Sequence, residues 1–195
     1  MTKDQDLSSK PGPQSYLSGI KGVLFDLDGV LYVGDRVIPR ARESIEACQR
    51  AGMSRRFITN TSTMSRDSLL RKLTALEFDV DAGELLSAPQ AAASYLRALR
   101  AERSVHLLLA SDVKADFADI AQTTLNEAEC IVIGDIGDAW TCDLLDRIFN
   151  RLMAGARLIV IHKNRFWQTD AGLRMDVGGF VAALELFRYG GPCHG

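Results

Sequence analysis

The stretch Gly22-Val23-Leu24-Phe25-Asp26-Leu27-Asp28-Gly29-Val30 decides the fold expected of this 195-residue chain. It starts as an apolar run, Val23 to Phe25, which is typical of a strand buried on both faces in a parallel sheet covered by helices. The run ends in Asp26 and Asp28, and the chemistry of open α/β sheets gathers where strands end at their carboxyl side. The two carboxylates therefore predict a Mg²⁺ site with a carboxylate nucleophile.

A plain surface turn is the alternative interpretation of the same residues. Aspartate and glycine are ordinary turn residues, so Asp26-Leu27-Asp28-Gly29 taken alone supports a solvated turn about as well as a site. The buried-strand pattern just before these residues favours the site.

Composition and charge argue against several classes of function. The chain has 23 Lys and Arg against 25 Asp and Glu, a formal net charge of −2, so it carries no electrostatic footprint of a nucleic-acid binder. No apolar run approaches the length that spans a membrane, so no membrane partner is expected. The four cysteines form no C-x-x-C pair, which favours reduced thiols in a cytoplasmic protein. Residues 1–17 and 191–195 are expected to be tails, the first of them flexible.

Beyond the first strand, the chain alternates between strand patterns and helix patterns, which predicts the α/β class. The second expected strand stops in hydroxyl and amide side chains, Thr59 to Thr63, and Ser65 is a good N-cap for the helix that follows. A polar loop is expected at residues 162–170. The other expected strands are 105–109, 131–133 and 158–161, and the expected helices begin near Pro39, Ser65, Pro89, Asp112, Asp143 and Phe180.

Four residues supply what phosphoryl transfer to a carboxylate requires. A carboxylate that attacks a phosphate meets charge repulsion, which a bridging Mg²⁺ largely removes. A second acid two residues on can protonate the leaving group and later activate water. A hydroxyl and an amide at the end of a neighbouring strand can hold the phosphoryl oxygens. These residue types occur here as Asp26, Asp28, Thr59 and Asn60.

The joint pattern resembles the haloacid dehalogenase superfamily of phosphatases, subclass II-A. Phe25 to Tyr32 resembles the first motif of that superfamily, and Ile58 to Ser62 resembles the second. The resemblance implies an α/β fold with a partial doubly wound parallel core, residues 18–81 and 178–190. It also implies an α/β cap domain, residues 82–177, inserted between the second and third motifs.

The resemblance assigns roles to the residues of the two motifs. Asp26 would be the nucleophile and a Mg²⁺ ligand. Asp28 would be the general acid and base, and would also bind the Mg²⁺ ion through its backbone carbonyl. Thr59, with Asn60 beside it, would bind the phosphoryl group. The implied reaction is hydrolysis of a phosphate ester, phosphoamide or pyrophosphate through an aspartyl-phosphate.

The cap loop that faces the active site in this subclass supplies further candidates. Asn164, Arg165 and Asp170 lie on it and are candidates for contact with a small phosphorylated substrate. A solvated loop charge is the alternative for Arg165. His162 is expected to pack in the loop as readily as to act in a site, and packing is favoured for Trp167.

The chain departs from the family after Glu185. The family continues with a strand ending in Gly-Lys-Pro and, further on, with paired acids, whereas the last lysine here is Lys163 and no Asp or Glu follows Glu185. The missing lysine would position the nucleophile, and the missing acids would complete the Mg²⁺ site. The sequence thus resembles a C-terminally truncated form whose phosphatase activity is impaired. A non-catalytic interaction or regulatory protein is the alternative, and a homodimer formed through the cap is left open.

The same departure changes the environment expected for the first strand. In the family's sheet this strand is central, and one of its neighbours belongs to the part not found here. Val23 to Phe25 should then form an edge strand with apolar side chains, which favours association with another chain. The cap should keep its own core.

Overall fold

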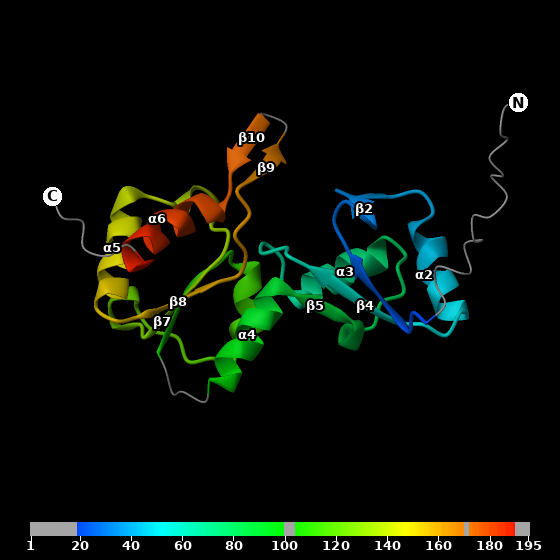
Figure 1. The fold of residues 1–195 in the computed structure, drawn as a ribbon, viewed down its shortest axis with the longest axis horizontal. Helices are drawn as coiled ribbons and strands as arrows, with labels where there is room; N and C mark the ends of the chain where they lie inside the picture. The colour runs from blue at the N-terminus through cyan, green and yellow to red at the C-terminus, as the bar shows by residue number, and fades with distance from the viewer. Residues whose placement is uncertain (1–18, 100–103, 170–171, 190–195) are drawn as a thin grey trace, which may run out of the picture. The chain divides into compact units, whose positions relative to one another are not determined.

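The computed structural model describes residues 19–99, 104–169 and 172–189 (Figure 1). Strands and helices alternate along these residues, which confirms the α/β class. The chain divides into two compact units, Met1–Phe57 and Ile58–Gly195. The expected tails and Asp170 lie outside the described residues. No helix of the described ranges is long and apolar enough to cross a membrane.

The first unit is organised on a strand that carries the stretch quoted above. It contains β1 (Gly22–Asp26), a hairpin of β2 (Tyr32–Val33) and β3 (Arg36–Val37), helix α2 (Ala41–Arg50) and most of β4 (Ser54–Thr59). The chain after the helix returns to β1, because the Ser54 amide donates to the Lys21 carbonyl at 2.9 Å. The rings of Phe25 and Phe57 stack with 5.6 Å between their centroids, which ties β1 to β4.

Strand β1 lies at the edge of its sheet. Among the described strands the order is β1-β4-β5, with β5 at Leu85–Ser87. The side chain of Leu24 is 67% exposed. The expectation of a strand buried on both faces is therefore wrong here, because one face of β1 stays in solvent and only one side of it has a hydrogen-bonded neighbour. The expectation of an edge strand with exposed apolar residues is confirmed for the described residues.

The second unit is built around a parallel sheet of β6 (Val105–Leu108), β7 (Cys130–Ile133) and β8 (Arg157–Val160), in the order β6-β7-β8. Every residue of the central strand β7 is buried. Its sequence, Cys-Ile-Val-Ile, is the continuous apolar run that a strand covered on both faces requires. The expected strands at 105–109, 131–133 and 158–161 thus form one sheet.

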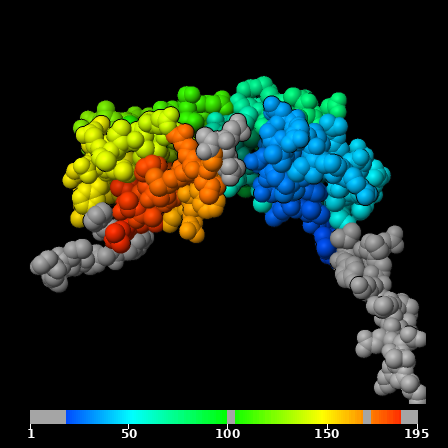
Figure 2. All heavy atoms as spheres, turned by 90° about the horizontal axis from the view of Figure 1, so that it is seen from above, coloured from blue at the N-terminus to red at the C-terminus, as the bar shows by residue number. Residues whose placement is uncertain are grey.

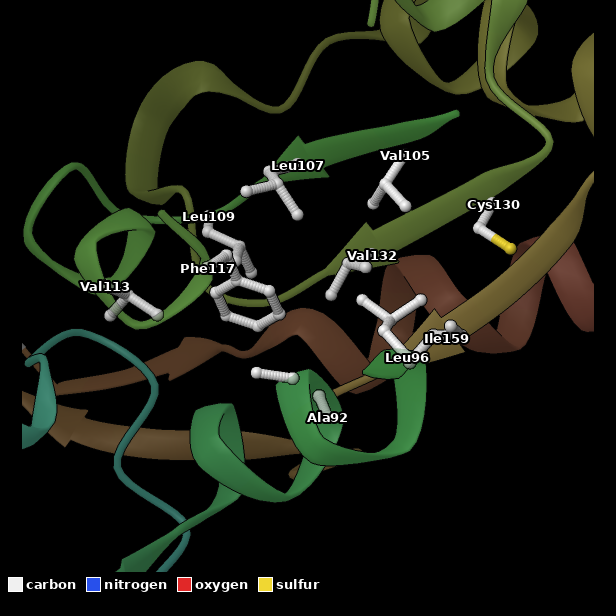
Figure 3. Close-up of a cluster of buried hydrophobic side chains, with 11 residues drawn as sticks. Ala92, Leu96, Val105, Leu107, Leu109, Val113, Phe117, Cys130, Val132 and Ile159 are labelled. Carbon is white, nitrogen blue, oxygen red and sulfur yellow. The ribbon is translucent and has the colours of Figure 1, made fainter. Parts of the chain in front are cut away.

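Two hydrophobic clusters cover the two faces of this sheet. On one face, α4 (Ala88–Ala98) and the 3₁₀ helix η2 (Asp112–Phe117) pack on Cys130 and Val132 (Figure 3). On the other face, α5 (Cys142–Met153) and α6 (Val177–Tyr189) pack on Ile131 and Ile133. The alternation of β7 side chains between the two clusters is the period-2 geometry of a strand.

Helix caps fix where the helices of this unit begin. The Ser65 side chain accepts from the Ser68 amide and caps α3 (Arg66–Ala75), as the sequence predicts. Ser87 accepts from the Gln90 amide and starts α4, and Thr141 accepts from the Leu144 amide and starts α5. Each cap satisfies one of the unpaired amides at a helix N-terminus.

The polar loop expected at residues 162–170 contains a strand. Strand β9 (Phe166–Thr169) pairs antiparallel with β10 (Gly172–Met175). Phe166 is 56% exposed and Leu173 is 68% exposed. The hairpin was missed because its apolar side chains Phe166, Trp167, Leu173 and Met175 are exposed, so they form no regular apolar alternation in the sequence.

Helix α6 packs within the second unit. Val177, Val181 and Leu184 form its buried stripe, spaced as one face of a helix requires, and they join the cluster that contains Ile148 of α5. Figure 2 shows α6 in red against α5 in yellow. The resemblance implied that this segment begins the return to the core. In the structure it instead covers the sheet that the cap segment forms. The domain bounds themselves stay a prediction.

Candidate active site

The Asp26 and Asp28 carboxylates lie in a turn at the carboxyl end of β1. Two buried leucines hold this turn, because the Leu31 amide donates to the Leu27 carbonyl at 2.8 Å. Gly29 has a φ of +79°, a conformation that favours glycine, and its amide donates to the Tyr32 carbonyl at 2.8 Å. Both aspartates are exposed. The turn and the strand end are therefore parts of one local structure. The interpretation as a surface turn and the interpretation as a site at a strand end are thus compatible.

Negative charge gathers around this turn. The pKa of the Tyr32 phenol is raised to about 12, first by burial and then by the charges of Asp28 and Asp26. A negative potential of this kind attracts a cation. Because the two carboxylates are exposed, a cation can reach them.

Thr59 and Asn60 follow the end of β4. The Thr59 hydroxyl is buried, accepts from the Thr61 amide at 3.1 Å and lies 2.8 Å from the Thr61 hydroxyl. These contacts curl the chain into a tight turn after the strand. Asn60 is exposed, and its side-chain amide donates to the side-chain oxygen Oδ1 of Asn164 at 3.3 Å. Two of the predicted site residues, 104 positions apart, therefore meet.

The segment after β4 is anchored to loops at the carboxyl end of the second unit's sheet. The Ser62 hydroxyl lies 2.7 Å from Nε2 of His162, which follows β8. The Ser65 amide donates to Asp112 at 2.7 Å, and the Arg66 amide donates to Asp116 at 3.1 Å. Sequence reasoning gave neither aspartate a role, because contacts between residues about fifty positions apart leave no local pattern.

The anchoring aspartates differ in their electrostatics. Hydrogen bonds from the Ser65 amide, and then from the Ser68 hydroxyl, hold the pKa of Asp112 below its ordinary value. Burial raises the pKa of Asp116, although the Arg66 amide works in the opposite direction. Asp112 is thus the anchor that is stabilised as a carboxylate.

A cavity of about 490 Å³ opens at the carboxyl end of β6 and β7. Its wall is mostly apolar, with polar groups from Thr63, Ser111 and Lys114, and from Asp135 on the loop after β7. Thr63 belongs to the segment anchored above. A volume of this size suits a small organic molecule, and a site at this edge of a parallel sheet is the usual one. The other lining residues are Leu107, Leu108, Leu109, Ala110, Ile136, Gly137, Ala139 and Leu144.

Comparison with known proteins identifies the family. The family model described as haloacid dehalogenase-like hydrolase matches residues 23–122. The chain belongs to this family. The match includes both stretches that resemble the first and second motifs of the haloacid dehalogenase superfamily.

Curated relatives of this haloacid dehalogenase-like chain are longer than it is. It is 36% identical over 166 residues to haloacid dehalogenase-like hydrolase domain-containing protein 2 of Rattus norvegicus, covering 85% of this chain and 62% of that protein. It is 37% identical over 177 residues to phospholysine phosphohistidine inorganic pyrophosphate phosphatase of the same organism, covering 87% of this chain and 63% of that protein. The chain thus spans less than two thirds of these relatives.

A solved structure shares the fold. The p-nitrophenyl phosphatase from Archaeoglobus fulgidus superimposes with a TM-score of 0.79 at 23% identity, over 89% of this chain and 67% of that one. At this identity the likeness establishes the haloacid dehalogenase-like fold alone.

The predicted site residues of this family member fall in both units. Asp26 and Asp28 belong to the first unit, and Thr59, Asn60, Asn164 and Arg165 belong to the second. Arg165 is exposed on the loop after β8. Among the described residues, no three His, Cys, Asp or Glu side chains gather as a metal site. Two exposed carboxylates nevertheless fit Mg²⁺, which keeps several waters and binds proteins through one or two carboxylates.

Proposed function

We propose that this chain carries the nucleophile, the first phosphate-binding segment and the cap of a Mg²⁺-dependent phosphohydrolase. One observation supports this most strongly: in a chain of the haloacid dehalogenase-like family, the first strand ends in Asp26 and the turn after it carries Asp28, and both carboxylates are open to solvent. The substrate class is a small phosphorylated molecule, either a phosphate ester, a phosphoamide or a pyrophosphate.

Asp26 and Asp28 divide the chemistry between them. A carboxylate oxygen of Asp26 attacks phosphorus, and the bond from phosphorus to the leaving group breaks, which gives an aspartyl-phosphate. Asp28 donates its proton to the leaving group and then takes a proton from the water that hydrolyses the aspartyl-phosphate. Mg²⁺ held by Asp26 and by the Asp28 carbonyl would offset the repulsion between carboxylate and phosphate.

Residues of the second unit would hold the substrate. Thr59 and Asn60 would bind the phosphoryl oxygens, and Asn164 and Arg165 would contact the substrate from the loop after β8. The hydrogen bond between Asn60 and Asn164 supports a shared site for these two amides.

Slow turnover is expected of the 195-residue polypeptide assayed by itself. It has no lysine after Lys163 and no acid after Glu185, so the charge balance and the metal ligands that the family adds beyond this point are not supplied. Positioning and electrostatic stabilisation are large parts of catalysis. We therefore expect a rate far below roughly 10 per second, the median for enzymes.

We further propose a cytoplasmic protein that dimerises through the cap. The exposed apolar side chains of the β9–β10 hairpin, Phe166, Trp167, Leu173 and Met175, support an interface there. Sedimentation of the purified chain should then give the mass of a dimer, and a charged substitution at Leu173 should shift it towards the monomer.

Replacing the nucleophile tests the catalytic proposal. Hydrolysis of an aryl phosphate in the presence of Mg²⁺ should be abolished by Asp26→Asn and nearly abolished by Asp28→Asn, because an amide neither attacks phosphorus usefully nor exchanges a proton at neutral pH. Asp146→Asn, an exposed position on α5, is the matched control and should keep full activity.

Two outcomes would contradict this assignment. Undiminished turnover in a pure Asp26→Asn sample would show that the nucleophile lies elsewhere. A folded chain without any hydrolysis or phosphate binding would favour the alternative, a non-catalytic interaction or regulatory protein.

A further inference from the structure

A serine, a histidine and an aspartate form a buried polar chain in the second unit, and the proposed chemistry does not use them. The Ser62 hydroxyl lies 2.7 Å from Nε2 of His162. On the other side of the ring, Nδ1 lies 4.0 Å from a carboxylate oxygen of Asp176, and both of those side chains are only 8% exposed. Ser62 is 4% exposed. Polar groups buried to this extent are costly unless they are paired, so the arrangement is specific.

The hydrogen bonds around the ring define its tautomer. The Asn164 amide donates to Nδ1 at 3.4 Å, so Nδ1 is the acceptor and Nε2 carries the hydrogen. Nε2 then donates to the Ser62 oxygen, and the hydroxyl hydrogen of Ser62 is left for another acceptor. At 4.0 Å the Asp176 oxygen is too far for a hydrogen bond, but its charge faces the ring.

Asp176 is itself held in place. Its other carboxylate oxygen accepts from the Val177 amide at 2.6 Å, at the first turn of α6. The Gly178 amide donates to the Asn164 carbonyl at 3.0 Å. A Cβ on Gly178 would lie 2.6 Å from the Lys163 carbonyl oxygen, so the start of α6 touches the loop backbone directly. The imidazole therefore projects from a loop that the helix fixes.

Ser62, at the other end of this polar arrangement, lies at the carboxyl edge of the sheet. A Cβ on Gly134, directly after β7, would lie 3.7 Å from the Ser62 Cβ and 3.2 Å from the Ile161 side chain. Ser62 is thus seated over the ends of β7 and β8. The turn that contains Thr59 and Thr61 comes immediately before it.

We propose that His162 is a positioning residue: its Nε2–H holds Ser62, and through Ser62 it holds the turn Thr59–Thr61 in the conformation that binds a phosphoryl group. The Asn164 amide, which donates to Nδ1, keeps the ring oriented for this contact. The consequence for phosphate binding rests on the proposed function, whereas the consequence for the turn does not.

Substituting His162 by glutamine or by asparagine, two amide side chains of similar size, separates the role of Nε2 from that of simple packing. A glutamine side chain can place its amide N–H where Nε2 lies, whereas an asparagine side chain reaches only the position of Nδ1. His162→Gln should therefore preserve the contact with Ser62, and His162→Asn should lose it. Thermal unfolding of both variants checks that the fold is kept.

Amide hydrogen exchange gives the first readout. In His162→Asn the Thr61 amide, bonded to Thr59, should exchange about fivefold to tenfold faster than in the wild type, the factor expected for one lost hydrogen bond. In His162→Gln the change should stay below about twofold. The Ser65 and Arg66 amides, which are bonded to Asp112 and Asp116, are internal controls and should not change.

Titration with inorganic phosphate in the presence of Mg²⁺ gives the second readout. The dissociation constant should rise about fivefold to tenfold in His162→Asn and recover in His162→Gln. Ser62→Ala should have the same effect as His162→Asn, and the double variant should add nothing further, because both remove one contact.

The two readouts separate this inference from the proposed function. If the Thr61 amide exchanges equally fast in His162→Asn and in the wild type, the positioning role is overturned, whatever the dissociation constant for phosphate. A wild-type chain that binds no phosphate, but whose Thr61 exchange responds as expected, contradicts the proposed function and supports the positioning role.

Discussion

A missing side chain decides how closely α6 approaches the loop after β8. A Cβ on Gly178 would clash with the Asn164 backbone carbonyl oxygen, and backbone atoms cannot move aside as the end of a side chain can. By contrast, a Cβ on Gly83 would meet nothing within 4 Å. The two glycines therefore differ in what they do, although neither has a positive φ.

Gly178→Ala should lower the free energy of unfolding by about 2–3 kcal/mol, the upper part of the range for overpacking. Gly83→Ala, its control, should change the free energy by less than about 1 kcal/mol. Urea unfolding of the two variants measures both. Equal stability of Gly178→Ala and wild type would mean that the helix start does not pack on the loop as described.

Among the elements, α3 shows how a helix N-terminus depends on residues far away in sequence. Asp112 on η2 accepts from the Ser65 amide and from the Ser68 hydroxyl, at 2.7 and 3.0 Å. Asp116 accepts from the Arg66 amide. A negative charge at this end of a helix also interacts favourably with the helix dipole.

The lowered pKa of Asp112 predicts a pH dependence with a definite sign. Its carboxylate stabilises the fold above the ordinary pKa of 3.8, and this contribution is lost as the pH falls through the lower folded value. Asp112→Asn should therefore lower the urea midpoint at pH 7, and the difference from wild type should shrink below pH 4.

Asp116→Asn is the matched variant with the opposite trend. Burial raises the pKa of Asp116, so its contribution is fully present below the ordinary value and is lost as the pH rises through the folded value. The urea midpoint of Asp116→Asn, relative to that of the wild type, should therefore be higher at pH 7 than at pH 3. Parallel pH profiles for the two variants would contradict the different environments described for them.

Across the whole molecule, the two units differ in how well their sheets are covered. The sheet of the second unit has a buried cluster on each face. Strand β1 is an edge strand among the described residues, and Leu24 on it is 67% exposed. An apolar edge strand favours pairing with another chain.

We expect self-association through β1 to respond to charge. Leu24→Lys should lower the associated fraction in sedimentation, with little effect on stability because the side chain is already exposed. Leu186→Lys, at a leucine that is 69% exposed on α6, is the control and should not change it. Amides of Val23 and Phe25 should also exchange faster than those of Leu158 and Ile159. Slow exchange at β1 in a monomeric sample would contradict this expectation.

Local patterns account for what could be predicted from the sequence. The apolar run at β7 predicts a buried strand, Ser65 predicts the start of α3, and the alternation of elements predicts the α/β class. The motif stretches around Asp26 and Thr59 point to the haloacid dehalogenase-like family that the comparison shows. These features depend on residues close together in the chain, which is why periodicity and residue type reveal them.

Only the tertiary structure decided which neighbour each element has. The apolar stripe of α6 suits any apolar partner, yet it packs on β7 and α5. The contact of Ser62 with His162 joins residues 100 positions apart. A local pattern states which faces need burial, whereas the partner that buries them is selected by the packing of the whole unit, because no short stretch contains both sides of such a contact.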